Sequence, residues 1–565
     1  MLPAFATNFS QTFSGTQTLA YIIISVLNAV MLFFASMKFI LVLQQCGYKG
    51  KKYFKWLTSS DTPYLSRLML LCLLALLFSC VLNLSFVPVF TTIAGIDGSR
   101  VASYVGFASY ALFALVYIKS ESAINAKVPL RKTKRLVRLC ITYLILLALI
   151  TFGLIVLLNY IAYILGSELF SIIRFAFICA MPILMPYILF LAYSINEPFE
   201  NKIKKYYIRK TTEKLKNSDV IKIGITGSFA KTSVKEILKT ILSQKYRVLS
   251  TFGSYNTPMG ISLTTKKLDN TYDIFIAEMG ARYKGDIKVL ADMVNPTYCV
   301  LTGINVQHLE TFKSEENIKD TKFELFDNPN KNKIGFFACN TEGSMELYNR
   351  FDGEKYLGGI GNEDALAYAT DITVSSTGTE FNLNIKGEKP VACKTVLLGR
   401  HSIKNICLAS AVAYKIGMTP EEISVGINRL SSIEHRLELV PNNKNMVIID
   451  DSYNSNVDGT KSAMEVLDAF SGRKIVVTPG LVELGKIENV ANAEFGRILA
   501  KHADIIIVVG KHNAETIING LIDGGMDKKN IIFAKNLKKG NEELNAILSD
   551  GDVVLFENDL PDNYN

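Results

Sequence analysis

Residues 224–238, GITGSFAKTSVKEIL, have the order of residue types that builds a phosphate-binding loop. An apolar run at 221–226, IKIGIT, has the pattern of a strand, a Gly- and Ser-containing loop follows it, and Lys-Thr-Ser opens a helical pattern. In such a unit the backbone N–H groups of the loop and the positive end of the helix bind phosphate. The strict GxxxxGK[ST] pattern is not met, because position 225 is Ile and position 230 is Ala. An ordinary strand–turn–helix is therefore the alternative interpretation.

The loop predicts a role for each polar residue. Backbone N–H groups from Gly227 to Lys231 would surround a phosphate, and the Lys231 ammonium would neutralise β- and γ-phosphate charge. Thr232 or Ser233 would supply a hydroxyl to Mg²⁺. Ala230 needs either a negative φ or some backbone strain, because a methyl group stands where the pattern has Gly.

Strand-like apolar runs alternate with helical patterns from residue 220 onward. Such alternation predicts α/β units with parallel sheets, in which ligands bind at the carboxyl ends of the strands. Besides IKIGIT, the runs are DIFIAEMG (273–280), TYCVLTGI (297–304), NMVIIDDS (445–452), KIVVTPG (474–480), DIIIVVGK (504–511) and VVLFEN (553–558).

The first 200 residues differ in composition from the rest. The chain has 565 residues, enough for three or four domains, and 49% of them are hydrophobic. The first 200 hold 15 Lys/Arg and six acids and so carry the whole net charge of +9, while the remainder is balanced at 46 to 46. This balance argues against a nucleic-acid partner. The nine scattered cysteines contain no CxxC, which predicts packing residues in a reducing compartment.

Five apolar runs in this region are long enough to cross a membrane, which takes about 20 helical residues. Loops 45–66 and 120–137 and the tail 201–216 are rich in Lys and Arg, whereas the loops at 95–100 and 159–168 are not. Because basic loops stay in the cytoplasm, we expect a multi-pass plasma-membrane protein with its N-terminus outside. Arg174 would snorkel to the outer interface or contact a lipid or substrate phosphate. The runs are 19–44, 67–94, 101–119, 138–165 and 169–194.

A succession of motifs follows the loop in the order found in the Mur ligase family, which this chain resembles, and most of all its branch that adds D-alanyl-D-alanine in peptidoglycan synthesis. The TGxxGK[TS] loop of the family is similar to Thr226, Gly227, Ser228, Phe229, Ala230, Lys231, Thr232 and Ser233. The further motifs are GSYNTPMGISLT (253–264), AEMGARYKGDI (277–287), NVQHLETFKSEENIKDTKFELF (305–326), LLGRHSIKN (397–405), EHRLE (434–438), IDDSYNSNVDG (449–459) and VELG (482–485).

The resemblance implies a site for ATP and two Mg²⁺ ions. Thr232 and Glu278 would bind the first ion, and His308 the second. Lys322 matches a lysine that many members carry as a carbamate, an anionic metal ligand; an ordinary solvated lysine is the alternative. Asp451 matches the aspartate of the third domain, with Tyr453, Asn454 and Asn456 around it.

The resemblance also implies the residues that hold the nucleotide. Asn340 matches the asparagine at the adenine ring, and His401 and Asn405 belong to the next ATP motif, where Ser402 replaces the usual Asn. Arg436 matches a hinge arginine, beside His435, for which a plain surface position is the alternative. The expected domains are a transmembrane helical domain (1–200), a basic linker (201–219), an α/β P-loop central domain (220–435) and an α/β Rossmann-like C-terminal domain (436–565).

The implied reaction is amide-bond formation driven by ATP. A carboxylate attacks the γ-phosphate, and an amine then attacks the acyl phosphate. The family's usual uridine-diphosphate-gripping domain has no room before the loop, so we expect the acceptor to be a lipid-linked glycan precursor and the amine an amino acid or dipeptide. Two features favour an amine other than D-alanyl-D-alanine. They are Val457 in place of the usual Pro and the sequence VTPGLVELG at 477–485. The alternatives are a membrane-anchored ligase for a soluble nucleotide-sugar peptide and a non-catalytic nucleotide-binding scaffold.

Overall fold

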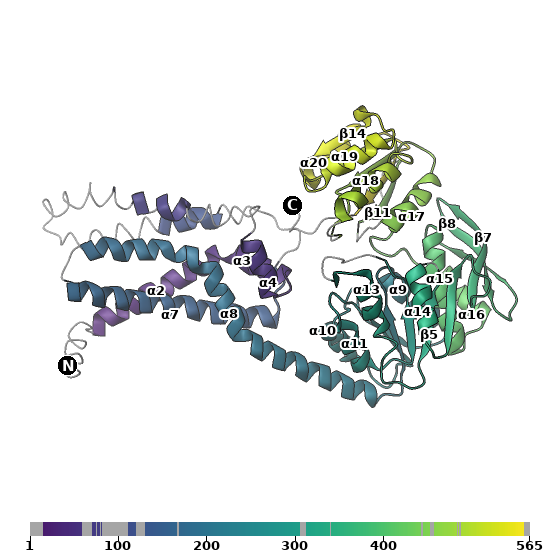
Figure 1. The fold of residues 1–565 in the computed structure, drawn as a ribbon, viewed down its shortest axis with the longest axis horizontal. Coiled ribbons are helices and arrows are strands. Elements are labelled where there is room, and N and C mark those ends of the chain that lie inside the picture. The colour runs from purple at the N-terminus through teal and green to yellow at the C-terminus, as the bar shows by residue number, and fades with distance from the viewer. Residues whose placement is uncertain are drawn as a thin grey trace. The chain divides into compact units, whose positions relative to one another are not determined.

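The computed structural model describes residues 15–58, 70–74, 76–78, 81, 111–119, 130–165, 169–305, 312–339, 341–441, 445–452, 457–482, 484 and 487–558. The chain divides into two compact units, Met1–Ile203 and Lys204–Asn565. The described part of the first unit is helical, and the second holds two sheets covered by helices (Figure 1).

Apolar runs form α2, α3, α7 and the start of α8 in the first unit, whereas α4 lies in the Lys-rich segment 45–66. Their shared core buries Phe39, Tyr53, Tyr143 and Leu189. The helices are α2 (Gly15–Ala35), α3 (Met37–Gln45), α4 (Gly50–Leu57), α7 (Lys134–Leu165) and α8 (Leu169–Lys216), of which α8 runs on into the second unit.

The apolar run at 19–44 is divided between two helices instead of forming one. The break lies at Ser36, which is fully buried and whose hydroxyl donates to the Phe33 carbonyl at 2.7 Å. A serine hydroxyl that bonds back to the preceding turn competes with the helical hydrogen bonds, which accounts for the interruption.

Two of the described helices are long and apolar enough to cross a membrane, over Thr18–Ala35 and Lys134–Leu158. The expected runs 67–94 and 101–119 fall mostly outside the described residues, and 169–194 forms the start of α8, where the side chains of 169–180, Arg174 included, are not described. The five-span prediction thus remains a prediction, with two described helices that meet its length and composition.

A nine-stranded sheet forms the centre of the second unit, in the order β2-β3-β1-β4-β5-β6-β7-β8-β9. Strands β2 to β7 are parallel, as the alternating pattern predicts, and β8 and β9 add an antiparallel edge. The strands are β1 (Ile221–Thr226), β2 (Val248–Ser250), β3 (Ile274–Glu278), β4 (Tyr298–Leu301), β5 (Ile334–Ala338), β6 (Lys355–Ile360), β7 (Ala367–Ser375), β8 (Gly378–Ile385) and β9 (Val391–Thr395).

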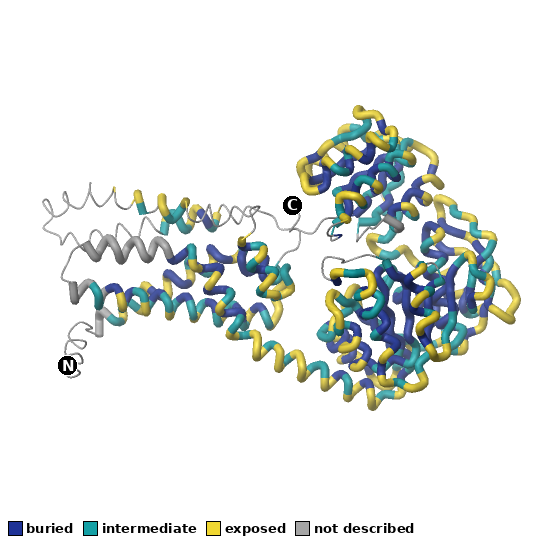
Figure 2. The backbone as a smooth tube through the Cα atoms, viewed as in Figure 1, coloured by how far each residue is buried: buried dark blue, intermediate teal, exposed yellow. Residues whose placement is uncertain are grey.

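Helices cover both faces of this sheet, so its parallel strands are buried on two sides (Figure 2). One face packs against α9 (Lys231–Leu242), α15 (Arg400–Ile416) and α16 (Pro420–Asn428). The other packs against α10 (Pro258–Thr265), α11 (Asp286–Val294), α13 (Glu315–Phe323) and α14 (Glu342–Arg350).

A six-stranded sheet follows, in the order β10-β11-β15-β12-β13-β14, parallel except for β10. Its apolar strands pack against helices on both faces, as in a Rossmann-like domain. The elements are β10 (Glu438–Leu439), β11 (Val447–Asp451), α17 (Val457–Asp468), β12 (Lys474–Thr478), α18 (Glu488–Leu499), β13 (Ile505–Val509), α19 (Ala514–Asp523), η2 (Lys528–Asn530), β14 (Ile531–Ala534), α20 (Leu537–Ile547) and β15 (Val553–Glu557).

The last turns of α8 pack onto the central domain. Leu215 is buried in its core, the Thr211 hydroxyl donates to the Ser262 hydroxyl at 2.9 Å, and Lys214 Nζ donates to the Thr265 carbonyl at 2.7 Å. Most of the segment expected as a basic linker (201–219) is therefore the end of helix α8, and one face of this helix packs against the central domain.

Candidate active site

The phosphate loop and Glu278 lie side by side at the carboxyl edge of the central sheet. Strands β1 and β3 are parallel neighbours, with Ile225 opposite Glu278. Because β1 lies between β3 and β4, the loop after β1 opens where the strand order reverses, and such switch points form the ligand crevice of open α/β sheets.

The loop is held against the strand that follows it in the sheet. Ser228 N donates to the Gly303 carbonyl at 2.8 Å, and its hydroxyl donates to the Asn305 carbonyl at 3.1 Å. Gly227 has φ +153°, and a Cβ there would lie 2.1 Å from Thr302 Oγ1. No larger residue fits at position 227 without moving β4 or its loop.

Of the two conformations expected for Ala230, the structure shows the strained one. Its φ is +59° and ψ is 4°, the left-handed conformation that favours Gly, and it is the N-cap of α9 with no side-chain capping bond. The loop therefore keeps the backbone path that a glycine would take, and the substitution strains the backbone.

Lys231 bends back over its own loop. Its Nζ donates to the carbonyls of Gly227 at 2.8 Å and Ser228 at 3.1 Å. Burial, partly opposed by the Glu278 carboxylate and aided by the Arg436 cation, lowers the pKa of Lys231 to about 8.

Glu278 is a fixed carboxylate with 1% of its surface exposed. Its Oε2 accepts from the Thr232 hydroxyl at 3.0 Å and from Lys235 Nζ at 3.2 Å, and its Oε1 accepts from Asn256 Nδ2 at 3.2 Å. A carboxylate and a hydroxyl within 3.0 Å of each other are the hard oxygen donors that Mg²⁺ prefers, so the predicted pair Thr232 and Glu278 fits this ion. Ser233, the alternative hydroxyl, is buried.

Two contacts of Glu278 were not predicted from the sequence. Lys235 lies four residues after Lys231, within the apolar positions Val234, Ile237 and Leu238 of α9, and this spacing on one helix face is the signal that points to it. Asn256 lies inside the motif GSYNTPMGISLT, but no pattern singled it out.

Lys322 is buried, with 3% exposure, so the solvated-lysine alternative is wrong. Its Nζ lies 5.8 Å from the centre of the Phe312 ring. Burial lowers the pKa of Lys322 to about 7, and the positive charge of Lys231 adds to this effect. A lowered pKa raises the neutral fraction of a lysine at pH 7, and the neutral amine is the nucleophilic form.

Several predicted site residues lie outside the described part of the chain, so nothing is said of their position. They are His308, Asn340, Tyr453, Asn454 and Asn456.

The predicted ATP motif after β9 opens α15. Ser402 is buried, and its hydroxyl donates to the Leu398 carbonyl at 2.8 Å and lies 3.2 Å from His401 Nε2. Burial, with the cations Lys404 and Arg436, lowers the pKa of His401 to about 4. Asn405 is buried one turn further along the helix.

The remaining predicted residues are Arg436 and His435, between the two sheets, and Asp451, at the end of β11. Arg436 lies close enough to lower the pKa values of Lys231, His401 and Asp451. Asp451 Oδ1 accepts from Leu437 N at 3.3 Å, and burial raises its pKa to about 6.

His435 Nδ1 lies 2.7 Å from Asp450 Oδ2, and this hydrogen bond raises its pKa. The side chain is half exposed and ion-paired.

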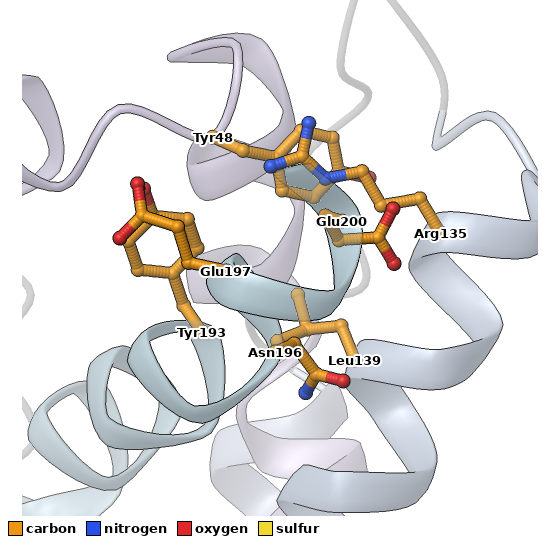
Figure 3. A pocket seen from close by; sticks show the side chains of 7 residues that line it. All are labelled: Tyr48, Arg135, Leu139, Tyr193, Asn196, Glu197 and Glu200. Carbon is orange, nitrogen blue, oxygen red and sulfur yellow. The ribbon is translucent and has the colours of Figure 1, made fainter. Parts of the chain in front are cut away.

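A separate small pocket lies in the first unit and contains none of the predicted site residues. Figure 3 shows its lining of Tyr48, Arg135, Leu139, Tyr193, Asn196, Glu197 and Glu200. Its charged groups are already engaged, because Arg135 lies 4.1 Å from the Tyr48 ring, Glu197 accepts from the Tyr193 hydroxyl at 2.8 Å, and Glu200 pairs with Arg138 at 2.6 Å. These contacts hold neighbouring helices of the first unit together.

Comparison with known proteins identifies the second unit. The Mur ligase middle domain matches residues 225–413, and the glutamate ligase domain of Mur ligases matches residues 435–557. The UDP-N-acetylmuramoyl-tripeptide–D-alanyl-D-alanine ligase of Escherichia coli (strain K12) is 30% identical over 337 residues, which cover 58% of this chain and 73% of that protein. The ligase of the same name from Bacillus subtilis (strain 168) is 28% identical over 338 residues, 59% of this chain and 72% of that one.

Solved structures show the same fold. The crystal structure of MurF ligase from Thermotoga maritima in complex with ADP aligns with a TM-score of 0.57 at 25% identity, over 63% of this chain and 80% of that one. Since two family patterns match in succession and a 30% identical relative is covered over nearly three quarters of its length, the chain belongs to the Mur ligase family of ATP-dependent, ADP-forming amide ligases.

Proposed function

We propose that the protein is a membrane-bound ligase that joins an amino acid or short peptide to a carboxylate on a lipid-linked glycan precursor of the cell envelope. The observation that carries the proposal is the joining of two parts: a Mur-type site with the half-buried Lys231 and the buried Glu278 and Lys322, and a helical unit outside both family matches.

The exposed surface of the helical unit supports its place in a membrane. Leu19, Ile23 and Leu27 on α2 and Ile145 and Leu149 on α7 are each more than half exposed. Figure 2 shows further exposed positions along both helices. Water-soluble proteins rarely expose apolar stripes of this length, whereas lipid covers them without cost.

The basic segments support the orientation. Gln44 exchanges hydrogen bonds with the backbone of Arg131 at 2.8 and 2.9 Å, and Arg138 pairs with Glu200. The start of segment 45–66, the end of segment 120–137 and the start of segment 201–216 therefore meet at one end of the helices, as expected if this end faces the cytoplasm.

The proposed reaction joins a carboxylate to an amine in two steps. The substrate carboxylate oxygen attacks the γ-phosphorus of ATP, a new O–P bond forms, and ADP leaves. The amine nitrogen then attacks the acyl carbon and the C–N bond forms. The acyl C–O bond breaks, phosphate leaves with the bridging oxygen and the electron pair, and the proton lost by the amine passes to solvent. Lys231 neutralises phosphate charge in the first step. Asp451, at the end of β11, would bind the amine substrate.

Two metal ions belong to this proposal. Thr232 and Glu278 would hold one Mg²⁺, and Lys322 as a carbamate, with His308, would hold the other; these ions would supply charge neutralisation at the transferred phosphoryl group. The lowered pKa of Lys322 supports carbamate formation, because only the neutral amine reacts with CO₂. Labelling with ¹³C-bicarbonate would produce a carbamate carbon signal that is absent from Lys322→Met.

The second candidate acceptor is a soluble nucleotide-sugar peptide, with the helices as an anchor. The names of the relatives from Escherichia coli and Bacillus subtilis favour it, and they make D-alanyl-D-alanine the first amine to test.

Phosphate release from Mg-ATP by the detergent-purified chain distinguishes these functions. Release that needs both an amine and a native membrane lipid extract supports the lipid-linked acceptor, with Lys231→Ala as the inactive control. Release with UDP-linked muramoyl peptide and amine alone assigns the soluble acceptor. A wild-type chain that binds ATP but releases no phosphate with any combination contradicts a ligase and supports a scaffold.

A further inference from the structure

Lys235 is a fully buried lysine whose ammonium group faces the proposed metal ligand. Its side chain has 0% exposure, and its Nζ lies 3.2 Å from Glu278 Oε2. It also donates to the Gly253 carbonyl and lies 3.3 Å from Glu236 Oε1. A lysine ammonium has three N–H donors; two of them are hydrogen-bonded here, to Gly253 and Glu278, and Glu236 is an ion-pair neighbour.

These contacts favour a role in holding the carboxylate. The Lys235 side chain has no exposed surface, and two of its donors bind protein oxygens, one of them Glu278 Oε2. It fixes the carboxylate, because Lys235 holds Oε2 while Asn256 holds Oε1 at 3.2 Å. The two oxygens of Glu278 are thereby restrained in position from both sides.

Lys235 also connects the carboxylate to the loop at 251–256. The Gly253 carbonyl that accepts from Lys235 and the Asn256 amide that donates to Glu278 both belong to this loop. The Thr251 hydroxyl in turn accepts from Glu278 N at 3.1 Å. Removal of the ammonium would therefore take away one restraint on the carboxylate and one on its neighbouring loop.

We propose that Lys235 is a positioning residue that orients Glu278 for Mg²⁺ in the nucleotide site. The proposal rests on the function proposed above, in which Glu278 is a metal ligand. Groups that orient a metal ligand through hydrogen bonds typically change metal affinity by 10- to 100-fold when removed.

The test compares ADP affinity with excess MgCl₂ and with EDTA, by calorimetry on the full chain in detergent. The readout is the ratio of the two dissociation constants. Lys235→Met should lower the Mg²⁺ enhancement about tenfold and leave the affinity in EDTA within about twofold. Lys239→Met is the matched control, because Lys239 lies one turn later on the same helix and its side chain is 45% exposed; it should leave both constants unchanged.

The two proposals fail in different ways. If Glu278→Gln leaves the Mg²⁺ enhancement unchanged, Glu278 is not the metal ligand and the proposed site is wrong. If Glu278→Gln abolishes the enhancement but folded Lys235→Met retains it, only the role of Lys235 is overturned. Should Lys235→Met not fold, Lys235→Gln decides, because its amide keeps N–H donors without the charge: an intermediate enhancement supports the proposal, and a wild-type value overturns it.

Discussion

Replacement of Ala230 by Gly should stabilise the protein, although most Ala-to-Gly changes do the opposite. Ala230 has φ +59° at the N-cap of α9, and an L-residue with a Cβ loses about 1–2 kcal/mol in this conformation. Gly removes that cost but adds about 0.5–1 kcal/mol of backbone entropy to the unfolded chain. We expect a net gain of about 0.5–1 kcal/mol.

Thermal unfolding of the full chain in detergent measures this gain. A change of 1 kcal/mol moves the midpoint of a domain of 150–250 residues by about 2–4 °C, so the transition of the central domain should rise by about 1–4 °C. The matched control is Ala491→Gly in α18, a helical position where the same change should cost about 1 kcal/mol. An unchanged or lower midpoint for Ala230→Gly would refute the assignment of strain to this loop.

Three further predictions concern other parts of the molecule. Gly227→Ala, which places a Cβ 2.1 Å from Thr302 Oγ1, should weaken ADP binding by about tenfold or more in calorimetry, and wild-type affinity would contradict the close approach. The pKa of His401 is about 4 in the folded protein, below its ordinary 6.5, so the unfolded chain takes up the proton first as the pH falls. The free energy of unfolding should therefore fall by about 3 kcal/mol between pH 6.5 and pH 4. In urea titrations, His401→Gln should reduce this pH dependence. Arg138→Met should lower the stability of the first unit by about 1–2 kcal/mol, because Glu200 loses two hydrogen bonds of 2.6 and 2.9 Å; an unchanged detergent melting curve would contradict it.

The sequence predicted the parts of the site that follow from sheet geometry. The loop at 226–233 and Glu278 each come directly after an apolar run, and parallel strands bring their carboxyl ends to one edge, so their meeting could be foreseen. The strands β1, β3, β4, β11, β12, β13 and β15 match the runs that were quoted as strand-like.

Other features depend on contacts that periodicity does not encode. The break at Ser36 needs a single hydroxyl to bond back to Phe33, whereas the surrounding hydropathy favours one continuous helix. The burial of Lys235 depends on acceptors that come from Glu278 and from Gly253, far apart along the chain. A lone lysine on a helix face is far more often solvated, so sequence reasoning passes over it.

The bent-back Lys231 has a consequence for what the site will accept. Its ammonium group rests on the carbonyls of Gly227 and Ser228, so the loop is closed by one of its own side chains. A ligand that enters must offer this cation something better than two neutral carbonyl oxygens. Adenosine carries no anionic oxygen, whereas ADP carries several. We therefore expect the loop to select ligands by their phosphate groups rather than by the base. Inhibitors built on a neutral purine alone should bind poorly.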